Sequence, residues 1–282
     1  MNGGHEQPIV AGAARELPAE RGLRRAWAGA RSAFHWILCA AYFFPVAVFL
    51  LLLGIFIDPR KNDGAQRMLS RVTMKLAGAK LRVRRAPGYD PTRTCFLVSN
   101  HVNLFDPFVL YASIPQFFRG LELESHFHVP VYGWMMKRFG NIPVPDNHRP
   151  SDLKRMWRMA RAALDSGVSL VAFPEGQRTL DGRVRPFKDG VFRMAVQFGA
   201  PIVPVSMVGA FEFNRKTSWT LRPGSIVVYL HDTIETKGLR KEDIPELRDR
   251  VQAIISAAVE AHSAASPVTA ELKESIPEKS KV

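Results

Sequence analysis

The stretch Thr94–Phe108 reads TCFLVSNHVNLFDPF, and it governs both the predicted fold and the predicted site. Thr94 to Ser99 are mostly apolar or β-branched, a composition that is typical of a buried strand. Polar residues follow at once, and Asp106 with Pro107 gives a helix start with Asp as N-cap and Pro at the first helical position. The stretch therefore predicts a strand, a short polar loop and a helix.

Similar apolar runs recur from Leu81 onward, and helix-like segments alternate with them. Runs without polar alternation are typical of strands that are covered on both faces. The alternation predicts an α/β fold with a mostly parallel or mixed central sheet flanked by helices. We expect strands at 81–84, 94–99, 141–144, 168–173, 201–207 and 225–230. We expect helices at 108–113, 188–198 and 245–262, and one that Ser151 caps and Gly167 ends.

An apolar segment at residues 36–57 precedes this alternating region. It carries no charged side chain and is long enough to cross the hydrocarbon core of a bilayer. Basic residues flank it on both sides, so charge bias does not orient it, and Pro45 near its middle favours a bend. A straight span and a bent segment dipping into one leaflet both fit. The pattern at 64–81, apolar on one side and basic on the other, predicts an interfacial helix or an ordinary surface helix.

The charge of the chain restricts its partners. Its 282 residues carry a net charge of +13 and a pI near 10.1, which favours nucleic acid, anionic lipid or phosphorylated substrates. Aromatic residues are not interleaved with basic ones as base-stacking platforms would be, so we expect no nucleic-acid partner. Cys39 and Cys95 both lie in apolar runs and indicate neither a disulfide framework nor a cysteine metal site, and His126 with His128 has no further ligand nearby. No metal is expected.

His101 and Asp106 lie in the polar loop that follows the strand at 94–99. A purely structural explanation needs only a capping Asp and a His whose nitrogens bind backbone groups. The functional interpretation folds His101 back toward Asp106, so that the carboxylate holds the imidazole as a general base. Because no GxSxG nucleophile motif is present, such a base would activate a hydroxyl group of a substrate.

A second strand runs into a polar turn at Leu170–Thr179, LVAFPEGQRT. Glu175 and Arg178 lie in this turn, which Gly176 shapes. A surface turn with an incidental ion pair is one interpretation. A phosphate site is the other, because ligands gather at strand ends of α/β sheets and Arg binds phosphate in a bidentate geometry. Further positive charge comes from Arg183, Arg185 and Lys188.

The two stretches together carry a resemblance. NHVNLFD at 100–106 matches the NHxxxxD motif, and FPEGQRT at 173–179 matches the FPEGxR(S/T) motif, of the glycerophospholipid acyltransferase family. The best-known members are lysophosphatidic acid acyltransferases. The resemblance extends over residues 75–235, with further matches at Gly140 in FGNIPV, at FKDG (187–190) and at Pro204 in PIVPVSM.

The resemblance implies roles for these residues. His101 would deprotonate the acceptor hydroxyl for attack on an acyl thioester, and Asp106 would orient His101. Similar sequences hold the acceptor with the second motif, which implies Glu175, Gly176 and Arg178 here. Gly140 and Lys188 are added as substrate-binding candidates on the supporting matches.

One position departs from the family pattern. Similar sequences often read GxIFIDR or GxIPVxR, with a final arginine for the acceptor phosphate, whereas GNIPVPD places Asp146 there. An aspartate would repel a phosphate. Either Arg149, three residues later, takes this role, or the acceptor is a different lysolipid.

The resemblance thus implies a membrane-bound O-acyltransferase that moves a fatty acyl group from coenzyme A or acyl carrier protein to a lysophospholipid. We expect no cofactor, a location on the inner or cell membrane with the domain facing the cytoplasm, and contact with anionic lipid. A membrane-bound thioesterase and a non-catalytic basic lipid-binding module are the alternatives. We divide the chain into a flexible basic N-terminus (1–30), a membrane-anchoring helical segment (31–79), the acyltransferase domain (80–264) and a flexible tail (265–282).

Overall fold

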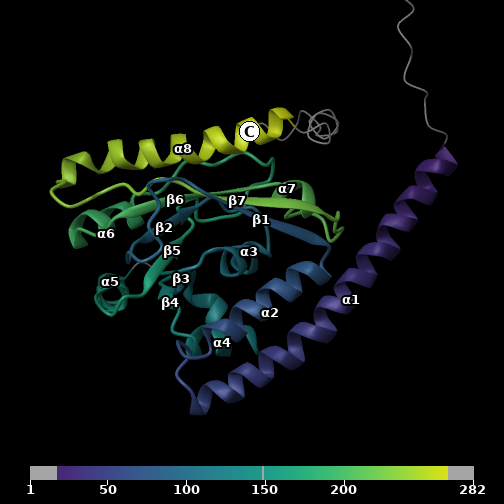
Figure 1. The fold of residues 1–282 in the computed structure, drawn as a ribbon, viewed down its shortest axis with the longest axis horizontal. Helices are drawn as coiled ribbons and strands as arrows, with labels where there is room; N and C mark the ends of the chain where they lie inside the picture. The colour runs from purple at the N-terminus through teal and green to yellow at the C-terminus, as the bar shows by residue number, and fades with distance from the viewer. Residues whose placement is uncertain (1–17, 148, 266–282) are drawn as a thin grey trace, which may run out of the picture.

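The computed structural model describes residues 18–147 and 149–265, and within them a single seven-stranded sheet forms the centre of the molecule (Figure 1). The strand order is β1-β7-β6-β2-β5-β3-β4. Neighbouring strands run parallel except β6 and β7, which are antiparallel. The strands are β1 (Ala79–Arg85), β2 (Phe96–Ser99), β3 (Phe118–Leu123), β4 (Ile142–Val144), β5 (Ser169–Ala172), β6 (Ile202–Val208) and β7 (Gly224–Leu230). The predicted α/β class with a mixed sheet is confirmed.

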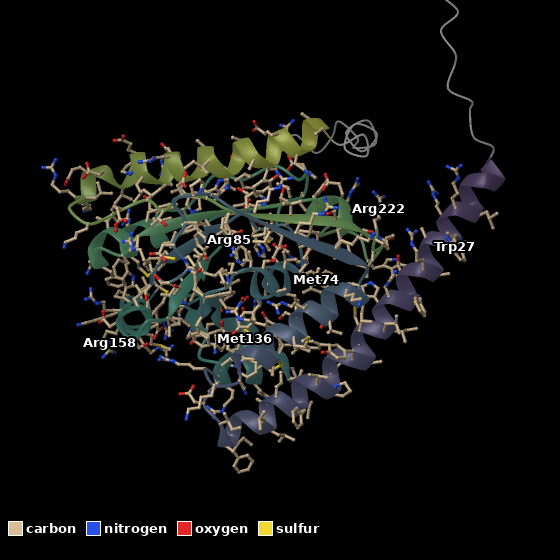
Figure 2. All side chains as sticks on the ribbon, viewed as in Figure 1. Trp27, Met74, Arg85, Met136, Arg158 and Arg222 are labelled. Atoms are coloured by element: carbon tan, nitrogen blue, oxygen red, sulfur yellow. The ribbon has the colours of Figure 1, made fainter. Side chains whose placement is uncertain are left out.

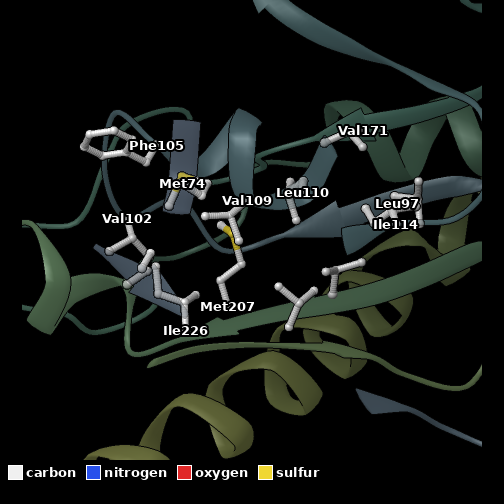
Figure 3. Close-up of a cluster of buried hydrophobic side chains, with 14 of the residues drawn as sticks. Met74, Leu97, Val102, Phe105, Val109, Leu110, Ile114, Val171, Met207 and Ile226 are labelled. Atoms are coloured by element: carbon white, nitrogen blue, oxygen red, sulfur yellow. The ribbon is translucent and has the colours of Figure 1, made fainter. Parts of the chain in front are cut away.

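Helices cover both faces of the sheet, as the continuous apolar strands require. Each face of the sheet packs against its own hydrophobic cluster, and alternate residues of β2 belong to different clusters. Leu97 packs in the cluster that contains Met74 and Val109, and Phe96 and Val98 pack in the cluster on the opposite face. Figure 3 shows the first cluster. The helices are α1 (Pro18–Phe56), α2 (Asp63–Leu76), α3 (Asp106–Ser113), η1 (Glu124–His128), α4 (Tyr132–Arg138), α5 (Pro150–Asp165), α6 (Gly190–Phe198), α7 (Ala210–Phe213), η2 (Lys241–Asp243) and α8 (Ile244–Ala265).

All six expected strands are present, but β3 was missed. It holds Arg119 and Gly120 where a strand pattern would need apolar residues. Arg119 is nevertheless buried, because its guanidinium lies 4.0 Å over the Phe117 ring and donates a hydrogen bond to the Tyr111 hydroxyl. The contacts with Phe117 and Tyr111 thus allow a charged side chain inside the sheet. A local sequence pattern does not show that such contacts will form.

Three expected boundaries are wrong. α1 begins at Pro18, so the expected flexible N-terminus ending at residue 30 is wrong for 18–30, while 1–17 and 266–282 lie outside the described residues. Phe105, not Asp106, is the N-cap of α3, and Arg149, not Ser151, is the N-cap of α5. In both helices the predicted cap lies inside the first turn, because a proline early in the helix allows a start one or two residues sooner.

The expected membrane segment is part of the single long helix α1, with Pro45 inside it, and α1 is long and apolar enough to cross a membrane. One side of α1 packs on the domain: Trp36 Nε1 donates to the Trp219 carbonyl at 2.8 Å, and Leu50 is buried beside Met135. The other side exposes large apolar side chains: Leu23, Trp27, Phe34, Ile37, Phe44, Val48, Phe49, Leu52, Ile55 and Phe56.

Helix α2 packs against both α1 and α3, which fits the interpretation of residues 64–81 as a surface helix packed on the domain. Arg67, which the pattern placed on a basic outer face, is buried and donates hydrogen bonds to the backbone carbonyls of Ile114 and Gln116. The arginine therefore ties α2 to the end of α3 and does not face solvent.

Candidate active site

The site lies where two parallel neighbours, β2 and β5, reach their carboxyl ends. Val98 pairs with Ala172, so the loop after β2 and the turn after β5 leave the sheet side by side. The carboxyl ends of parallel strands are where α/β proteins bind ligands. The fold therefore brings the two sequence motifs together.

His101 and Asp106 form a direct pair in this loop. His101 Nδ1 lies 2.8 Å from Asp106 Oδ2, and the Asp106 side chain is fully buried, whereas 23% of the His101 side chain is exposed. Because an ionised carboxylate only accepts hydrogen bonds, Nδ1 carries the proton and Nε2 is left with a lone pair. The pair has the geometry of an oriented general base.

The Asp106 carboxylate also determines the shape of the loop. It accepts the backbone N–H of Val102 at 2.5 Å and that of Asn103 at 3.1 Å. The chain therefore bends around the carboxylate, and Asp106 does not cap its own helix with its side chain. The prediction that the loop folds His101 back onto Asp106 is consistent with this geometry.

Two asparagines, which the sequence analysis did not single out, fasten the loop to β6 and α7. The Asn100 amide exchanges two hydrogen bonds with the backbone of Met207, at 2.8 and 2.9 Å. Asn103 Nδ2 donates to the carbonyls of Ala210 and Asn214. Their position within the NHxxxxD motif was a signal, but their partners lie more than a hundred residues away in the chain.

Glu175 is a second buried carboxylate, and it joins the two motifs. Its Oε1 accepts the backbone N–H of His101 at 2.7 Å, and its Oε2 accepts that of Arg185 at 2.9 Å. Burial raises the pKa of Glu175 to about 7, although these two N–H donors act in the opposite direction. Glu175 makes no ion pair with Arg178 in the described residues, so the incidental pair considered above is absent.

The turn after β5 also holds the His101 ring. Phe173 stacks on the imidazole with ring centroids 4.3 Å apart, and the Thr179 N–H donates to the His101 carbonyl at 2.9 Å. His101 is thus fixed by Asp106 at Nδ1, by Phe173 at one ring face and by hydrogen bonds to its backbone. Phe173 was missed because the F of FPEG reads as the end of an apolar strand.

The cations of this turn lie at its surface. Arg178 is half-buried and makes no hydrogen bond or ion pair with another residue that the structure describes. Gly176 has φ +70°, and a Cβ there would lie 2.8 Å from Lys188 Nζ. Glycine is therefore required both for the turn and for the approach of Lys188.

Three other candidate positions do not join this cluster. Gly140 precedes β4, at the amino edge of the sheet, with Arg119 as the neighbour of its backbone. Arg149 follows β4, which lies three strands from β2, about 14 Å across the sheet at ordinary strand spacing. Asp146 accepts the Ser125 N–H at 2.9 Å, beside the start of η1, which gives this departure from the family pattern a structural reason.

Comparison with known proteins agrees with the motifs. Residues 80–208 match the family model described as acyltransferase. Over this part of the chain the sequence is similar to the acyltransferase family. The matched region runs from β1 to the end of β6 and contains both loops of the site.

Several similar proteins are named 1-acyl-sn-glycerol-3-phosphate acyltransferases. The chain is 34% identical over 144 residues to a chloroplastic 1-acyl-sn-glycerol-3-phosphate acyltransferase of Brassica napus, covering 50% of this chain but only 40% of that protein. It is 28% identical over 224 residues to the alpha form of human 1-acyl-sn-glycerol-3-phosphate acyltransferase, covering 76% and 79% of the two chains. The Pseudomonas aeruginosa enzyme of that name is 27% identical over 66% of this chain and 71% of that one.

A solved structure shares the fold. The 1-acyl-sn-glycerophosphate acyltransferase of Thermotoga maritima aligns with a TM-score of 0.70 and 23% identity, over 86% of this chain and 97% of that chain. The predicted enzyme class, an O-acyltransferase, is confirmed by the match to the family model and by the named relatives. In an acyltransferase, a histidine with one free ring nitrogen at the open side of the site is suited to deprotonate an acceptor.

Glu175 predicts a pH-dependent stability of this acyltransferase. Because its pKa of about 7 in the folded state lies above the ordinary 4.5, the folded state binds the proton more tightly than the unfolded state. The contribution of Glu175 to the free energy of unfolding is therefore complete below pH 4.5 and is lost as pH rises through 7. Relative to Glu175→Gln, the wild type should lose about 3 kcal/mol over this interval.

Denaturant titrations at several pH values measure this difference. Glu246→Gln removes an exposed carboxylate on α8 and serves as the matched control, which should keep the wild-type slope. An identical pH slope in wild type and Glu175→Gln would show that Glu175 does not carry the shifted titration.

Proposed function

We propose that the chain transfers a fatty acyl group from a thioester carrier to the hydroxyl of a lysophospholipid, with lysophosphatidic acid as the acceptor. The observation that carries the proposal is the His101–Asp106 pair, held beside the basic FPEG turn at one sheet edge. The names of the relatives support the acceptor, and the fold supports the arrangement.

The proposed reaction needs no covalent enzyme intermediate. His101 Nε2 takes the proton of the acceptor hydroxyl while the hydroxyl oxygen bonds to the thioester carbonyl carbon. The C–S bond then breaks, and the departing thiolate takes the proton from the imidazolium, which returns His101 to its neutral form. Asp106 stabilises the imidazolium between these steps through its contact with Nδ1.

Replacement of either member of the pair tests this mechanism. His101→Ala and Asp106→Asn should each lower kcat for acylation of lysophosphatidic acid by at least about 100-fold, because a general base contributes about 10² to 10⁴. His126→Ala is the matched control, since His126 Nδ1 also contacts a carboxylate, that of Glu122, but at the exposed η1. Acylated lipid and free fatty acid are both quantified.

Two results would contradict the proposal. Wild-type activity in His101→Ala would exclude the assigned base. Release of free fatty acid by the wild type without acylated lipid would identify the chain as a thioesterase, in which the same pair activates water.

The phosphate of the acceptor needs a cation that Asp146 does not supply. In our proposal Arg178 binds it, because its guanidinium has no partner among the described residues and its turn lies directly beside His101. Lys188, held over Gly176, adds positive charge to the same turn. Glu175 would act on the acceptor only indirectly, by positioning, because both of its oxygens already accept backbone N–H groups.

The KM for the acceptor tests the role of Arg178. Arg178→Gln should raise the KM for lysophosphatidic acid about 10- to 100-fold, the value of a charged hydrogen bond, and leave the KM for the acyl donor unchanged. Arg158→Gln, an exposed arginine on α5, is the control for loss of one charge. An unchanged acceptor KM in Arg178→Gln would exclude this residue as the phosphate ligand.

We further propose that α1 lies along one leaflet of the membrane and does not cross it. Residues at the start of the apolar segment contact the domain: Cys39 Sγ donates to the Thr73 carbonyl, and the ring of His35, just before the segment, lies 2.7 Å from the Leu76 carbonyl. The exposed apolar side chains run from Leu23 to Phe56 along the described part of the helix.

Vesicle sedimentation tests this arrangement. Ile37→Ser and Ile55→Ser should each weaken binding to phospholipid vesicles about tenfold, from the apolar surface that each removes from the bilayer. Met159→Ser, on α5 at the other face of the sheet, should have no effect. Undiminished binding of the double variant Ile37→Ser/Ile55→Ser would contradict the proposal.

A further inference from the structure

A large cavity lies outside the catalytic loop, where α1 meets the domain. Its volume is about 670 Å³, within the range of small-molecule sites. Its walls come from the first half of α1, the segment from Gly209 to Phe213, the loop from Trp219 to Ser225, and the end of α8 at His262. Figure 2 shows Arg222 on the side of the domain that faces the upper part of α1.

The cavity is strongly basic. Arg25, Arg31 and Arg222 line it, and none of the three makes a side-chain hydrogen bond or ion pair with another residue in the described part of the chain. Glu212 is the one acidic side chain among the described lining residues, against these three arginines. Three guanidinium groups around one space favour a ligand that carries more than one phosphate.

The wall also offers an aromatic side chain, Trp219, on a loop that is hydrogen-bonded to α1. The Trp219 side chain is 57% exposed, and Gly29 of α1 packs against it, so that a Cβ at Gly29 would lie 3.7 Å from the indole. The loop is tied to α1 by the Trp36 indole, which donates to the Trp219 carbonyl, and by Ser32, which accepts the Leu221 N–H at 3.1 Å. An exposed aromatic ring beside arginines is suited to stack on a nucleobase.

One layer of side chains separates the cavity from the catalytic loop. Phe213 lines the cavity and packs edge-on against Phe105, with ring centroids 5.4 Å apart. Phe105 lies between His101 and Asp106, and the loop is bonded to Ala210 through Asn103. The cavity wall is therefore in direct contact with the loop that carries His101.

We propose that this cavity binds the nucleotide part of an acyl-coenzyme A donor, with its phosphates on Arg25, Arg31 and Arg222 and its adenine on Trp219. The proposal rests on the proposed acyl transfer and names the donor for it. A small-molecule donor fits better than a lipid head group, because Gly29 and Ser32 turn toward the domain while the exposed apolar side chains of α1 turn away from it. It also fits better than a carrier protein, which would need a broad surface and not a cavity.

Two thioesters that differ only in the nucleotide test the proposal. Palmitoyl-coenzyme A carries it, and palmitoyl-pantetheine does not. The double variant Arg25→Gln/Arg222→Gln should raise the KM for palmitoyl-coenzyme A at least tenfold, and leave kcat and the KM for palmitoyl-pantetheine unchanged. Trp219→Leu should also raise the KM for palmitoyl-coenzyme A. Arg158→Gln, at the far end of the molecule in Figure 2, should leave the KM values for both thioesters unchanged.

Binding of free coenzyme A, measured by calorimetry, gives a readout that does not depend on turnover. The double variant should lose at least tenfold in affinity. Unchanged coenzyme A binding would overturn the proposal, and so would an equal rise in KM for both thioesters. Weaker vesicle binding with an unaltered donor KM would overturn it in favour of a lipid head-group site. Coenzyme A binding without any acyl transfer would leave the cavity assignment in place and refute the proposed function.

Discussion

The buried carboxylate of Asp106 is the group on which the catalytic loop depends. A charge removed from water must be matched by donors, and here the donors are two backbone N–H groups of the loop and the ring nitrogen of His101. The loop can supply them only by bending around the carboxylate. The requirement that stabilises Asp106 is therefore the same one that orients the imidazole, and folding and catalytic geometry cannot be separated at this point.

A second buried carboxylate makes two loops into one site. Parallel pairing of β2 with β5 places the loops side by side, and Glu175 then binds the backbone of both. Without this contact the FPEG turn would be held near His101 chiefly by the Phe173 ring and the Thr179 amide. Burial of Glu175 destabilises its ionised form, as its raised pKa shows. The contacts of Glu175 in turn hold the imidazole of His101 close to the cations of the FPEG turn.

Helix α1 has two dissimilar sides, and both contribute to the arrangement. Its outer side is apolar along its length, and its inner side is fastened to α2 and to the loop at Trp219 by polar and aromatic contacts. Gly29 is the position where the helix backbone comes close enough for an indole to lie against it. The same packing of α1 on the domain encloses the basic cavity, which α1 and the domain line together.

The sequence by itself determined the α/β class, six of the seven strands and the identity of the paired groups. Continuous apolar runs and the NHxxxxD and FPEG patterns are local properties of the sequence. They can be recognised without knowing which other segments they contact. Only the tertiary structure decided that β3 tolerates Arg119, that Asp106 shapes the loop and does not cap α3, that Glu175 binds backbone, and that Gly140 lies at the opposite edge. Each of these outcomes depends on a contact between side chains or backbone groups of separate segments, or on the direction of a strand in the sheet. Local periodicity in the sequence encodes neither such contacts nor strand direction.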